Sequence, residues 1–323
     1  MNFLLFKLRF STAVHFGESD TALSLASSRE TFCADTLFSA LCHTALSMQG
    51  PDGLAQLCSW VKRGGLRLSD GMIFCGDTLC LPKPMARAQS AAELPAADRK
   101  AMKRLQWIPV FAFDGFAQSL AGGALFEPRR YAMQPGSMVE FSHVRLEEGE
   151  NPDLYSVGTF VFAEDCGLYL IARCGDPQQA GVLRMLLDAL GVSGIGGKVS
   201  SGYGRFSVIE QIDLDTAQDP QAVWLARALR ADTGRYLLLT ASLPRDEELD
   251  AVLDGANFAL IRRGGFVGSD HYADSARKKK TQYFLAAGSL LPRRFEGDLY
   301  EVGPGGAHPV YRYGRPILLG VTL

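Results

Sequence analysis

Apolar residues fill positions 3–6 and then alternate with Lys7 and Arg9 up to Phe10, and this pattern predicts a strand over residues 3–10. The apolar residues at its even positions would share one face, with Lys7 on the other. Apolar residues then recur at helical spacing over about 36–48, and Asp35 stands where a helix cap is expected. The chain is therefore predicted to begin with a strand and a helix.

Regular patterning returns in the middle of the chain. Residues 155–163 and 168–174 alternate like two strands around a short turn, which predicts a hairpin. Pro177 opens a helix with a stripe of leucines, and Gly191 is suitably placed as its C′ residue. A strand over 205–212 follows.

The order strand, helix, hairpin, helix, strand is the βαββαβ arrangement of the ferredoxin-like fold, which also underlies the common RNA-recognition module. We therefore predict an α+β first domain over 1–215, with a long insertion at about 50–150, where the pattern is irregular. A polar stretch at 213–222 is typical of a linker. A second unit over 223–323 begins with a strand near Tyr236, and pattern alone leaves its topology open.

Composition narrows the classes of function. The chain has 323 residues, 47% of them hydrophobic and 21% charged, which fits two globular domains and excludes general disorder. The net charge of −2 means that an RNA-binding surface would need its positive charge concentrated on one face. No apolar run reaches the roughly 18 residues of a membrane span, so a cytoplasmic protein is expected. The seven Cys lack metal-ligand spacing, which predicts reduced, mostly buried thiols and no metal site.

The segment GIGGKVSSGYGRF at 194–206 is the strongest local signal. Its five glycines cost backbone entropy, so packing alone explains them poorly. It lies after a helix and before a strand and lacks the required spacing, which excludes a P-loop or a dinucleotide fingerprint and any nucleotide cofactor. Amides, hydroxyls, cations and an aromatic ring in one loop suit the phosphates and bases of RNA, and the alternative is a mobile surface loop. The candidate RNA contacts are Gly194, Gly196, Gly197, Lys198, Ser200, Ser201, Gly202, Tyr203, Gly204 and Arg205.

Other polar residues give weaker signals. His15 would suit a general base acting on a 2′-hydroxyl, but no second acid or cation is recognisable near it, which favours a structural or RNA-contacting role. Glu18, Asp20 and Asp35 would suit a divalent cation, but a helix cap at Asp35 and solvated loop charges at the other two are simpler interpretations. Paired basic residues become informative only if they gather on one face; they are Arg129–Arg130, Arg262–Arg263 and Arg293–Arg294, with a basic run at 277–280.

These residues resemble the RAMP superfamily of CRISPR proteins, and most closely the subunit of the type III-A Csm effector complex that caps the crRNA 5′ end. The resemblance spans nearly the whole chain in the family's order. It is carried by HFGESD at 15–20, CADTLFSALCHTAL at 33–46, LPKP at 81–84, GIGGKVSSGYGRF at 194–206 and HPVYRYGRP at 308–316.

The resemblance implies two tandem ferredoxin-like (RRM-like) domains, a β-hairpin thumb formed by the insertion, and a subunit without catalytic residues, cofactor or metal. The implied partners are the 5′ tag of the crRNA, the large palm-domain signature subunit, an adjacent backbone RAMP subunit and target RNA near the thumb. Two alternatives remain open: a metal-independent endoribonuclease that processes CRISPR RNA through His15, and the equivalent subunit of a Cmr-type complex. Carried onto this sequence, the implied RNA contacts are the glycine loop, His15, Gly17, Arg129 and Arg130 of the thumb, Arg262 and Arg263.

Overall fold

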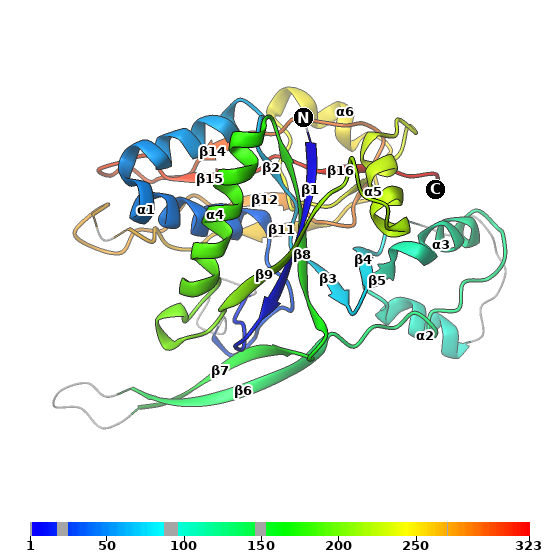
Figure 1. Cartoon of the computed structure of the whole chain (residues 1–323), viewed down its shortest axis with the longest axis horizontal. Coiled ribbons are helices and arrows are strands. Elements are labelled where there is room, and N and C mark those ends of the chain that lie inside the picture. The colour runs from blue at the N-terminus through cyan, green and yellow to red at the C-terminus, as the bar shows by residue number, and fades with distance from the viewer. Residues whose placement is uncertain (1, 18–24, 87–95, 146–152, 270) are drawn as a thin grey trace.

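The computed structural model describes residues 2–17, 25–86, 96–145, 153–269 and 271–323. Figure 1 shows a central sheet flanked by helices, with a long hairpin that projects from its lower end. The helices are α1 (Ala34–Lys62), α2 (Ala96–Arg104), α3 (Phe113–Leu120), α4 (Pro177–Ser193), α5 (Pro220–Arg230) and α6 (Leu249–Leu253), with short 3-10 turns η2 (Val110–Ala112), η3 (Val199–Ser201) and η4 (Asp246–Glu248). The strands are β1 (Asn2–Phe10), β2 (Arg67–Leu68), β3 (Met72–Cys75), β4 (Thr78–Pro82), β5 (Trp107–Pro109), β6 (Gly136–Arg145), β7 (Asp153–Phe162), β8 (Cys166–Cys174), β9 (Phe206–Asp213), β10 (Tyr236–Leu238), β11 (Leu260–Arg263), β12 (Gln282–Leu285), β13 (Leu290–Leu291), β14 (Leu299–Glu301), β15 (Tyr311–Tyr313) and β16 (Leu318–Gly320).

The large sheet is antiparallel and has the strand order β5–β4–β3–β8–β1–β9, with β2 also paired to β8. β1 pairs with β8 on one side and with β9 on the other. The strand predicted over 3–10 is confirmed as β1, and the strand predicted over 205–212 is confirmed as β9. The chain is thus a mixed α+β protein built on antiparallel strands.

Side chains cover both faces of this sheet. On one face, Phe6 and Leu8 pack with Leu41 of α1 and Leu187 of α4, all of them fully buried. On the other face, Leu5 belongs to a second core that includes side chains of α3, α5, β10 and β16. Burial of one such side chain stabilises the fold by about 1.5–3 kcal/mol. Ligand contacts must therefore come from the edges and ends of the sheet and from the hairpin.

The first helix is longer than predicted. α1 continues past Gly50, where a φ of 70° bends the chain, and restarts at Pro51, which is tolerated in a first helical turn because its missing N–H has no partner there. The N-cap is Cys33, without a side-chain cap. The prediction that Asp35 caps the helix is wrong, because its carboxylate instead binds the guanidinium of Arg263.

The hairpin predicted between 155–163 and 168–174 is also wrong. β7 pairs along its whole length with β6, and β8 pairs with β1, β2 and β3. Alternation identifies a strand without identifying its partner. The predicted insertion at about 50–150 is too broad, because α1 reaches Lys62 and β2, β3 and β4 belong to the large sheet.

The second long helix ends later than predicted. α4 begins at Pro177, as expected, with Asp176 as its N-cap, but it continues to Ser193. Gly194, with a φ of 94°, follows the helix, so the assignment of Gly191 as the C′ residue is wrong. Gly191 has another role: a Cβ there would lie 2.3 Å from the carbonyl oxygen of Phe206. Its lack of a side chain lets α4 approach β9 closely.

The C-terminal half contains several small sheets. β13, β10 and β16 form one, and β11–β12 and β14–β15 form antiparallel pairs. The opening strand predicted near Tyr236 is confirmed as β10, which pairs with β16 in antiparallel fashion. Residues 282–291 contain two strands, β12 and β13. The predicted linker at 213–222 is only partly correct, because α5 begins within it.

Buried polar groups join the two halves of the chain. Tyr313 accepts a hydrogen bond at 2.7 Å from the backbone amide of Leu68. Asp70 accepts one at 2.7 Å from the amide of Ala34 and another at 3.0 Å from the amide of Ala241. Because unpaired buried amides are costly, Asp70 fixes the start of α1 against the C-terminal half.

The buried carboxyl of Asp70 predicts a pH-dependent stability. Burial, reinforced by Asp35, raises its pKa from 3.8 to about 7, although the two amides and Arg263 oppose the rise. The folded state therefore binds this proton more tightly than the unfolded state, and the contribution to stability is lost as pH rises from 3.8 to about 7. The loss is up to about 1.4 kcal/mol per pH unit. Asp70→Asn is expected to remove this slope in urea unfolding at several pH values, and identical slopes for both proteins would contradict the assignment.

Candidate nucleic-acid interface

The glycine loop connects the end of α4 to the start of β9 and lies alongside the hairpin (Figure 1). It is packed against the body of the molecule: Ile195 is 1% exposed and belongs to the first core. Ser200, Ser201 and Arg205 are exposed on its outer side. The alternative of a loose surface loop does not fit this packing.

Packing accounts for most of the glycines, contrary to the sequence interpretation. Gly194, Gly196, Gly202 and Gly204 all have positive φ, which disfavours any side chain. A Cβ at Gly204 would lie 2.0 Å from the carbonyl oxygen of Ile195. Only at Gly202 is the space around such a Cβ open. The glycines shape the loop, and its ligand contacts must come from other groups.

Many backbone amides of the loop are also used inside the protein. The amide of Ile195 donates to the carbonyl of Gly204, that of Gly204 to Ala13, and that of Arg205 to the hydroxyl of Thr12. Further amides that donate to protein carbonyls are those of Gly194, Gly197, Ser201 and Gly202. The sequence predicts that the loop's amides are available to RNA phosphates, and at these positions that prediction is wrong. Side chains are left as the main contact groups.

His15 lies beneath the glycine loop. It is 5% exposed, its Nδ1 is 2.7 Å from the carbonyl oxygen of Gly158 in β7, and its own carbonyl accepts the amide of Gly197 at 2.8 Å. A Cβ at Gly197 would lie 2.5 Å from the His15 ring. The buried imidazole joins the first loop, the hairpin and the glycine loop. Gly17, two residues on, is exposed.

Side chains of the loop and the hairpin meet in one cluster. Lys198 Nζ lies 3.3 Å from the hydroxyl of Tyr155 and 4.8 Å from the centre of its ring. The hydroxyl of Tyr203 is 2.9 Å from Nε2 of His143, whose ring stacks on Tyr155 at 5.5 Å. Phe141 lies 6.1 Å from the Tyr203 ring. Burial raises the pKa of Tyr203, so its hydroxyl stays protonated near neutral pH.

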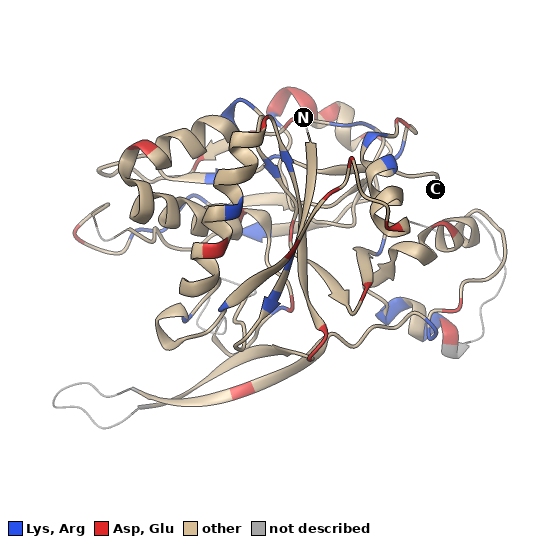
Figure 2. Ribbon diagram, viewed as in Figure 1, with Lys and Arg blue, Asp and Glu red and all other residues tan. Residues whose placement is uncertain are grey.

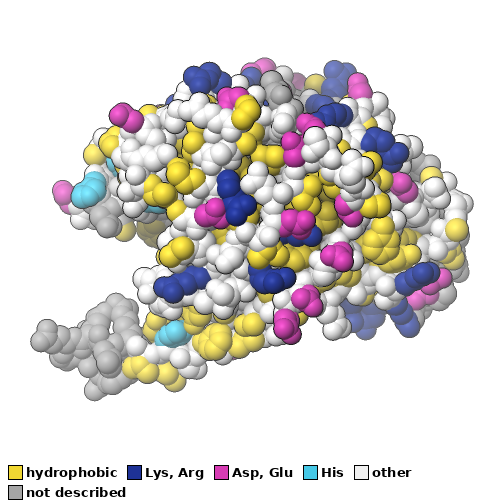
Figure 3. Space-filling model, viewed as in Figure 1, with side chains coloured by type: hydrophobic (Ala, Val, Ile, Leu, Met, Phe, Trp, Pro, Cys, Tyr) yellow, Lys and Arg dark blue, Asp and Glu magenta, His cyan; other side chains and the backbone are white. Residues whose placement is uncertain are grey.

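The sequence did not identify the hairpin members of this cluster. Phe141 and His143 stand two apart on β6, and Tyr155 stands opposite His143 on β7. Their alternation is a weak signal that gains meaning only once the pairing of β6 with β7 is known. The strands contain no Lys, and apolar side chains gather along the hairpin in Figure 3; the exposed ones are Met138, Phe141, Val144, Leu154 and Val161.

A groove of about 650 Å³ lies beside the loop. The glycine loop, α1 and the segment after β11 line it, and Arg263 and Lys279 bring cations to it. Arg263 is engaged there: Nη2 is 2.6 Å from Asp35 Oδ1 and Nε is 2.9 Å from Oδ2. Burial lowers the pKa of Lys279. The sequence indicates Arg263 as a candidate RNA contact. In the structure its guanidinium is instead engaged in an ion pair with Asp35 at the edge of the groove. The neighbouring Arg262 is exposed.

The basic pairs do not gather on one face. Arg129 lies 3.3 Å from Asp98 of α2 and lines a second cavity of about 640 Å³. Arg130 is exposed, 5.6 Å from the centre of the Tyr131 ring. Both precede β6, so their placement in the hairpin thumb is wrong. α2 itself carries several Lys and Arg, and in Figure 2 its blue ribbon lies on the side of the molecule away from the tip of the hairpin.

Metal and thiol chemistry adds little. Glu18 and Asp20 lie outside the described residues, and the described ranges contain no group of three or more His, Cys, Asp or Glu placed to bind a metal. The seven cysteines are free thiols, three buried and four half-buried. None of the helices in the described part of the chain is long and apolar enough to cross a membrane.

Comparisons with known proteins agree across the chain. A family model described as the CRISPR Csm4 C-terminal domain matches residues 231–321. The CRISPR system Cms protein Csm4 of Mycobacterium tuberculosis is 35% identical over 99% of this chain and 98% of its own, and that of Streptococcus thermophilus is 29% identical over 98% of both. The fold is similar to Csm4 in a crystal structure of a Csm3–Csm4 subcomplex from the type III-A CRISPR-Cas interference complex (TM-score 0.65, 18% identity, 99% of both chains). It is also similar to a Csm1–Csm4 cassette in complex with pppApA (TM-score 0.62, 19% identity, 99% of this chain and 98% of that one).

Proposed function

The chain belongs to the Csm4 family, and from this premise we propose that it is the crRNA-binding subunit of a type III-A Csm effector complex in antiviral defence, holding the repeat-derived 5′ tag of the guide. The observation that carries the proposal is the side-chain cluster at the junction of the glycine loop and the hairpin. Lys198 and the exposed Arg205 supply charge for phosphates. Tyr203, held at its hydroxyl by His143, supplies a flat surface for an unpaired base, and Tyr155 supports this arrangement from the hairpin.

We propose two protein partners. Csm4 chains of similar fold have been crystallised with Csm3 and with Csm1. By this likeness the present chain would dock the large palm-domain subunit and the adjacent backbone RAMP subunit, with target RNA passing near the hairpin. The exposed apolar side chains of the hairpin suit such contacts, because surfaces of this kind are usually covered by a partner.

The topology supports a ferredoxin-like first domain. Its four main strands in chain order are β1, β3, β8 and β9. In the sheet they lie in the order β9–β1–β8–β3, which is 4-1-3-2 by chain order, and α1 and α4 cover one face. A βαββαβ unit gives this order. We propose a second unit of the same class over 223–323 and a cytoplasmic location for the complex.

The subunit is proposed to be non-catalytic. His15, the candidate general base for guide processing, is 5% exposed and engaged by Gly158, so a 2′-hydroxyl does not reach it directly. Incubation of the purified chain with precursor RNA is expected to leave the RNA intact. A cut that His15→Ala abolishes and EDTA leaves unchanged would favour the endoribonuclease alternative instead. Mass spectrometry of the copurified subunits separates a Csm complex from a Cmr-type one.

Two substitutions test the tag-binding surface. Lys198→Ala and Arg205→Ala are each expected to weaken 5′-tag binding in the assembled complex by about tenfold, because a charge-assisted contact contributes about 1.5 kcal/mol. Each lost phosphate contact should also reduce the salt dependence of the affinity by about 0.7 in log–log slope. Binding is measured by fluorescence anisotropy with labelled tag RNA at several salt concentrations.

Arg184→Ala is the matched control for this pair. Arg184 is a half-exposed arginine of α4 that pairs with Asp188 in the next turn, 2.8 Å away. Its removal should leave tag affinity unchanged. If the double variant of Lys198 and Arg205 binds the tag as tightly as the unmodified chain, the loop is not the tag site.

A further inference from the structure

A second charged site lies at the other end of the large sheet. A cavity of about 100 Å³ is lined by Arg67, Arg173, Arg294 and Glu296 together with apolar side chains such as Phe3. Phe3 pairs with Arg173 at the start of β1, whereas the glycine loop adjoins the end of that strand. Seven residues of extended chain separate the two sites by about 23 Å.

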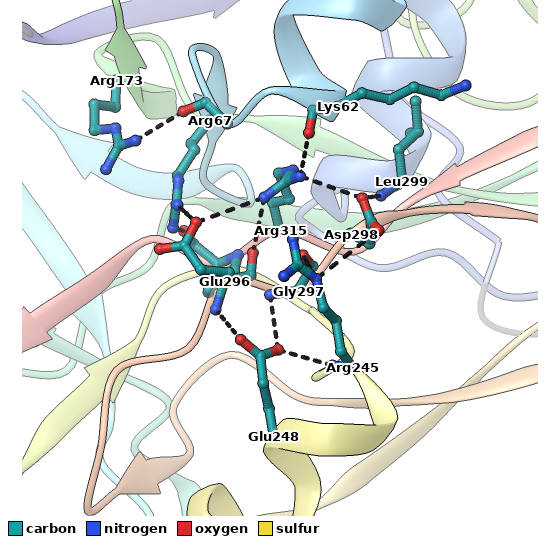
Figure 4. Close-up of polar contacts among 12 residues, drawn as sticks. Lys62, Arg67, Arg173, Arg245, Glu248, Glu296, Gly297, Asp298, Leu299 and Arg315 are labelled. Atoms are coloured by element: carbon teal, nitrogen blue, oxygen red, sulfur yellow. Dashed lines mark hydrogen bonds and ion pairs between the residues drawn. The ribbon is translucent and has the colours of Figure 1, made fainter.

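Positive charge exceeds negative charge in this cavity. Glu296 is the one acidic residue among its lining residues, and it pairs with Arg67; Arg315, behind the lining, lies 3.6 Å from Glu296 and 3.2 Å from Asp298 (Figure 4). Arg173 donates instead to the carbonyl of Gly64 at 2.7 Å. Arg294 donates to backbone carbonyls; these belong to Leu318, Leu229 and Ala231. Two of the three lining arginines therefore face the cavity without a carboxylate within ion-pair distance in the described part of the chain.

Several guanidinium groups here also have unused donors. Arg67 is 7% exposed and Arg315 is 2% exposed, so both are almost fully removed from water. The buried Nε atoms of Arg67, Arg173 and Arg315 have no hydrogen-bond partner among the described residues. Burial and the neighbouring Arg67 lower the pKa of Arg173, as expected where like charges are crowded. Buried donors without partners are rare and costly, so three of them in and beside one cavity mark it as a candidate ligand site.

We propose that this cavity receives a carboxylate side chain, an Asp or Glu, from a protein subunit that assembles with this chain. The guanidinium fork matches a carboxylate in two parallel hydrogen bonds. The volume of about 100 Å³ suits a carboxylate and is too small for a nucleotide with its base and ribose. The distance from the glycine loop separates the site from the proposed tag contacts. The partner assignment rests on the proposed membership of an assembled complex, but not on tag binding.

Charge reversal tests the site in the full chain. Arg173→Glu is expected to weaken binding to either the Csm1-type or the Csm3-type subunit at least tenfold, while the affinity for 5′-tag RNA stays within twofold. Arg184→Glu, the same reversal at a half-exposed site of α4, should change neither affinity. Unchanged affinity of Arg173→Glu for both subunits would overturn the proposal, as would a loss of RNA affinity alone.

A second variant covers the case in which Arg173→Glu does not fold. Arg173→Lys keeps the charge and supplies an amine that a carbodiimide couples to a carboxylate in contact. In the assembled complex we expect a cross-link to an Asp or Glu of a partner subunit, identified by mass spectrometry. A link confined to Glu296 of the same chain, or to an RNA 5′-phosphate, would refute the assignment. If the unmodified complex fails to hold tag RNA while the partner cross-link forms, the proposed function is wrong and the cavity assignment stands.

Discussion

Arg263→Ala is expected to lower the free energy of unfolding by about 3 kcal/mol, because it leaves a buried carboxylate without its main partner. The Asp35 side chain is 8% exposed and receives two hydrogen bonds from Arg263, at 2.6 and 2.9 Å. Arg312, whose Nε lies 3.8 Å from Asp35, would still partly neutralise the carboxylate. The expected loss therefore lies at the lower end of the roughly 3–5 kcal/mol that the breaking of a buried ion pair usually costs. Urea unfolding of the full chain measures the change.

Arg262→Ala is the matched control, one position earlier on β11 and exposed. Its effect on stability should stay within about 0.5 kcal/mol. If instead Arg263→Ala leaves stability unchanged and lowers RNA affinity, Arg263 is an RNA contact, as the sequence suggested, and the ion pair with Asp35 is of little consequence.

Gly204→Ala is expected to lower the free energy of unfolding by about 2–4 kcal/mol and to abolish tag binding. The backbone there has a φ of 76°, and the new Cβ would lie 2.0 Å from the carbonyl oxygen of Ile195. Relief of this clash requires the loss of two hydrogen bonds, from Ile195 to Gly204 and from Gly204 to Ala13. The loop would then no longer place Lys198 and Tyr203 next to the hairpin. Thermal unfolding and tag binding are measured on the same preparation.

Gly202→Ala separates backbone strain from steric clash. Its φ of 89° resembles that of Gly204, but the space around a Cβ is open. The expected cost is only the left-handed backbone term of about 1–2 kcal/mol, with tag binding retained. Equal losses at the two positions would mean that strain dominates and that the Ile195 contact contributes little.

Local patterns in the sequence predicted the elements whose stability depends on nearby residues. The alternation of apolar residues gave β1, and the leucine stripe with Pro177 gave α4, because each pattern reflects a face buried in the core. These local patterns did not predict which strands pair with each other across the chain. β7 pairs with β6 rather than with β8, and only the tertiary structure decides between two neighbours that both alternate.

The sequence singled out the glycine loop but not the packing and pairing of its groups, and RNA binding there stays a prediction. The glycine loop does lie at a junction where cations and aromatic rings meet, yet its glycines serve close packing and many of its amides are used internally. The hairpin residues His143 and Tyr155 carry no motif, and the engagement of Arg263 depends on an acid 228 positions away in the chain. Such contacts join residues that are distant in the sequence, so no local sequence pattern predicts them.

The burial of His15 has a mechanical consequence. Its ring contacts Gly158, and the adjacent Val14 exchanges two backbone hydrogen bonds with Phe160, so the hairpin is fastened near its root to the same residue that supports the glycine loop. The outer strands extend about 16 Å beyond this point. The hairpin is therefore tied to the glycine loop at two points: near its root through His15, and farther out through the contacts of Tyr155 and His143 with Lys198 and Tyr203. A partner that displaced the outer part of the hairpin would pull directly on these two side chains of the loop.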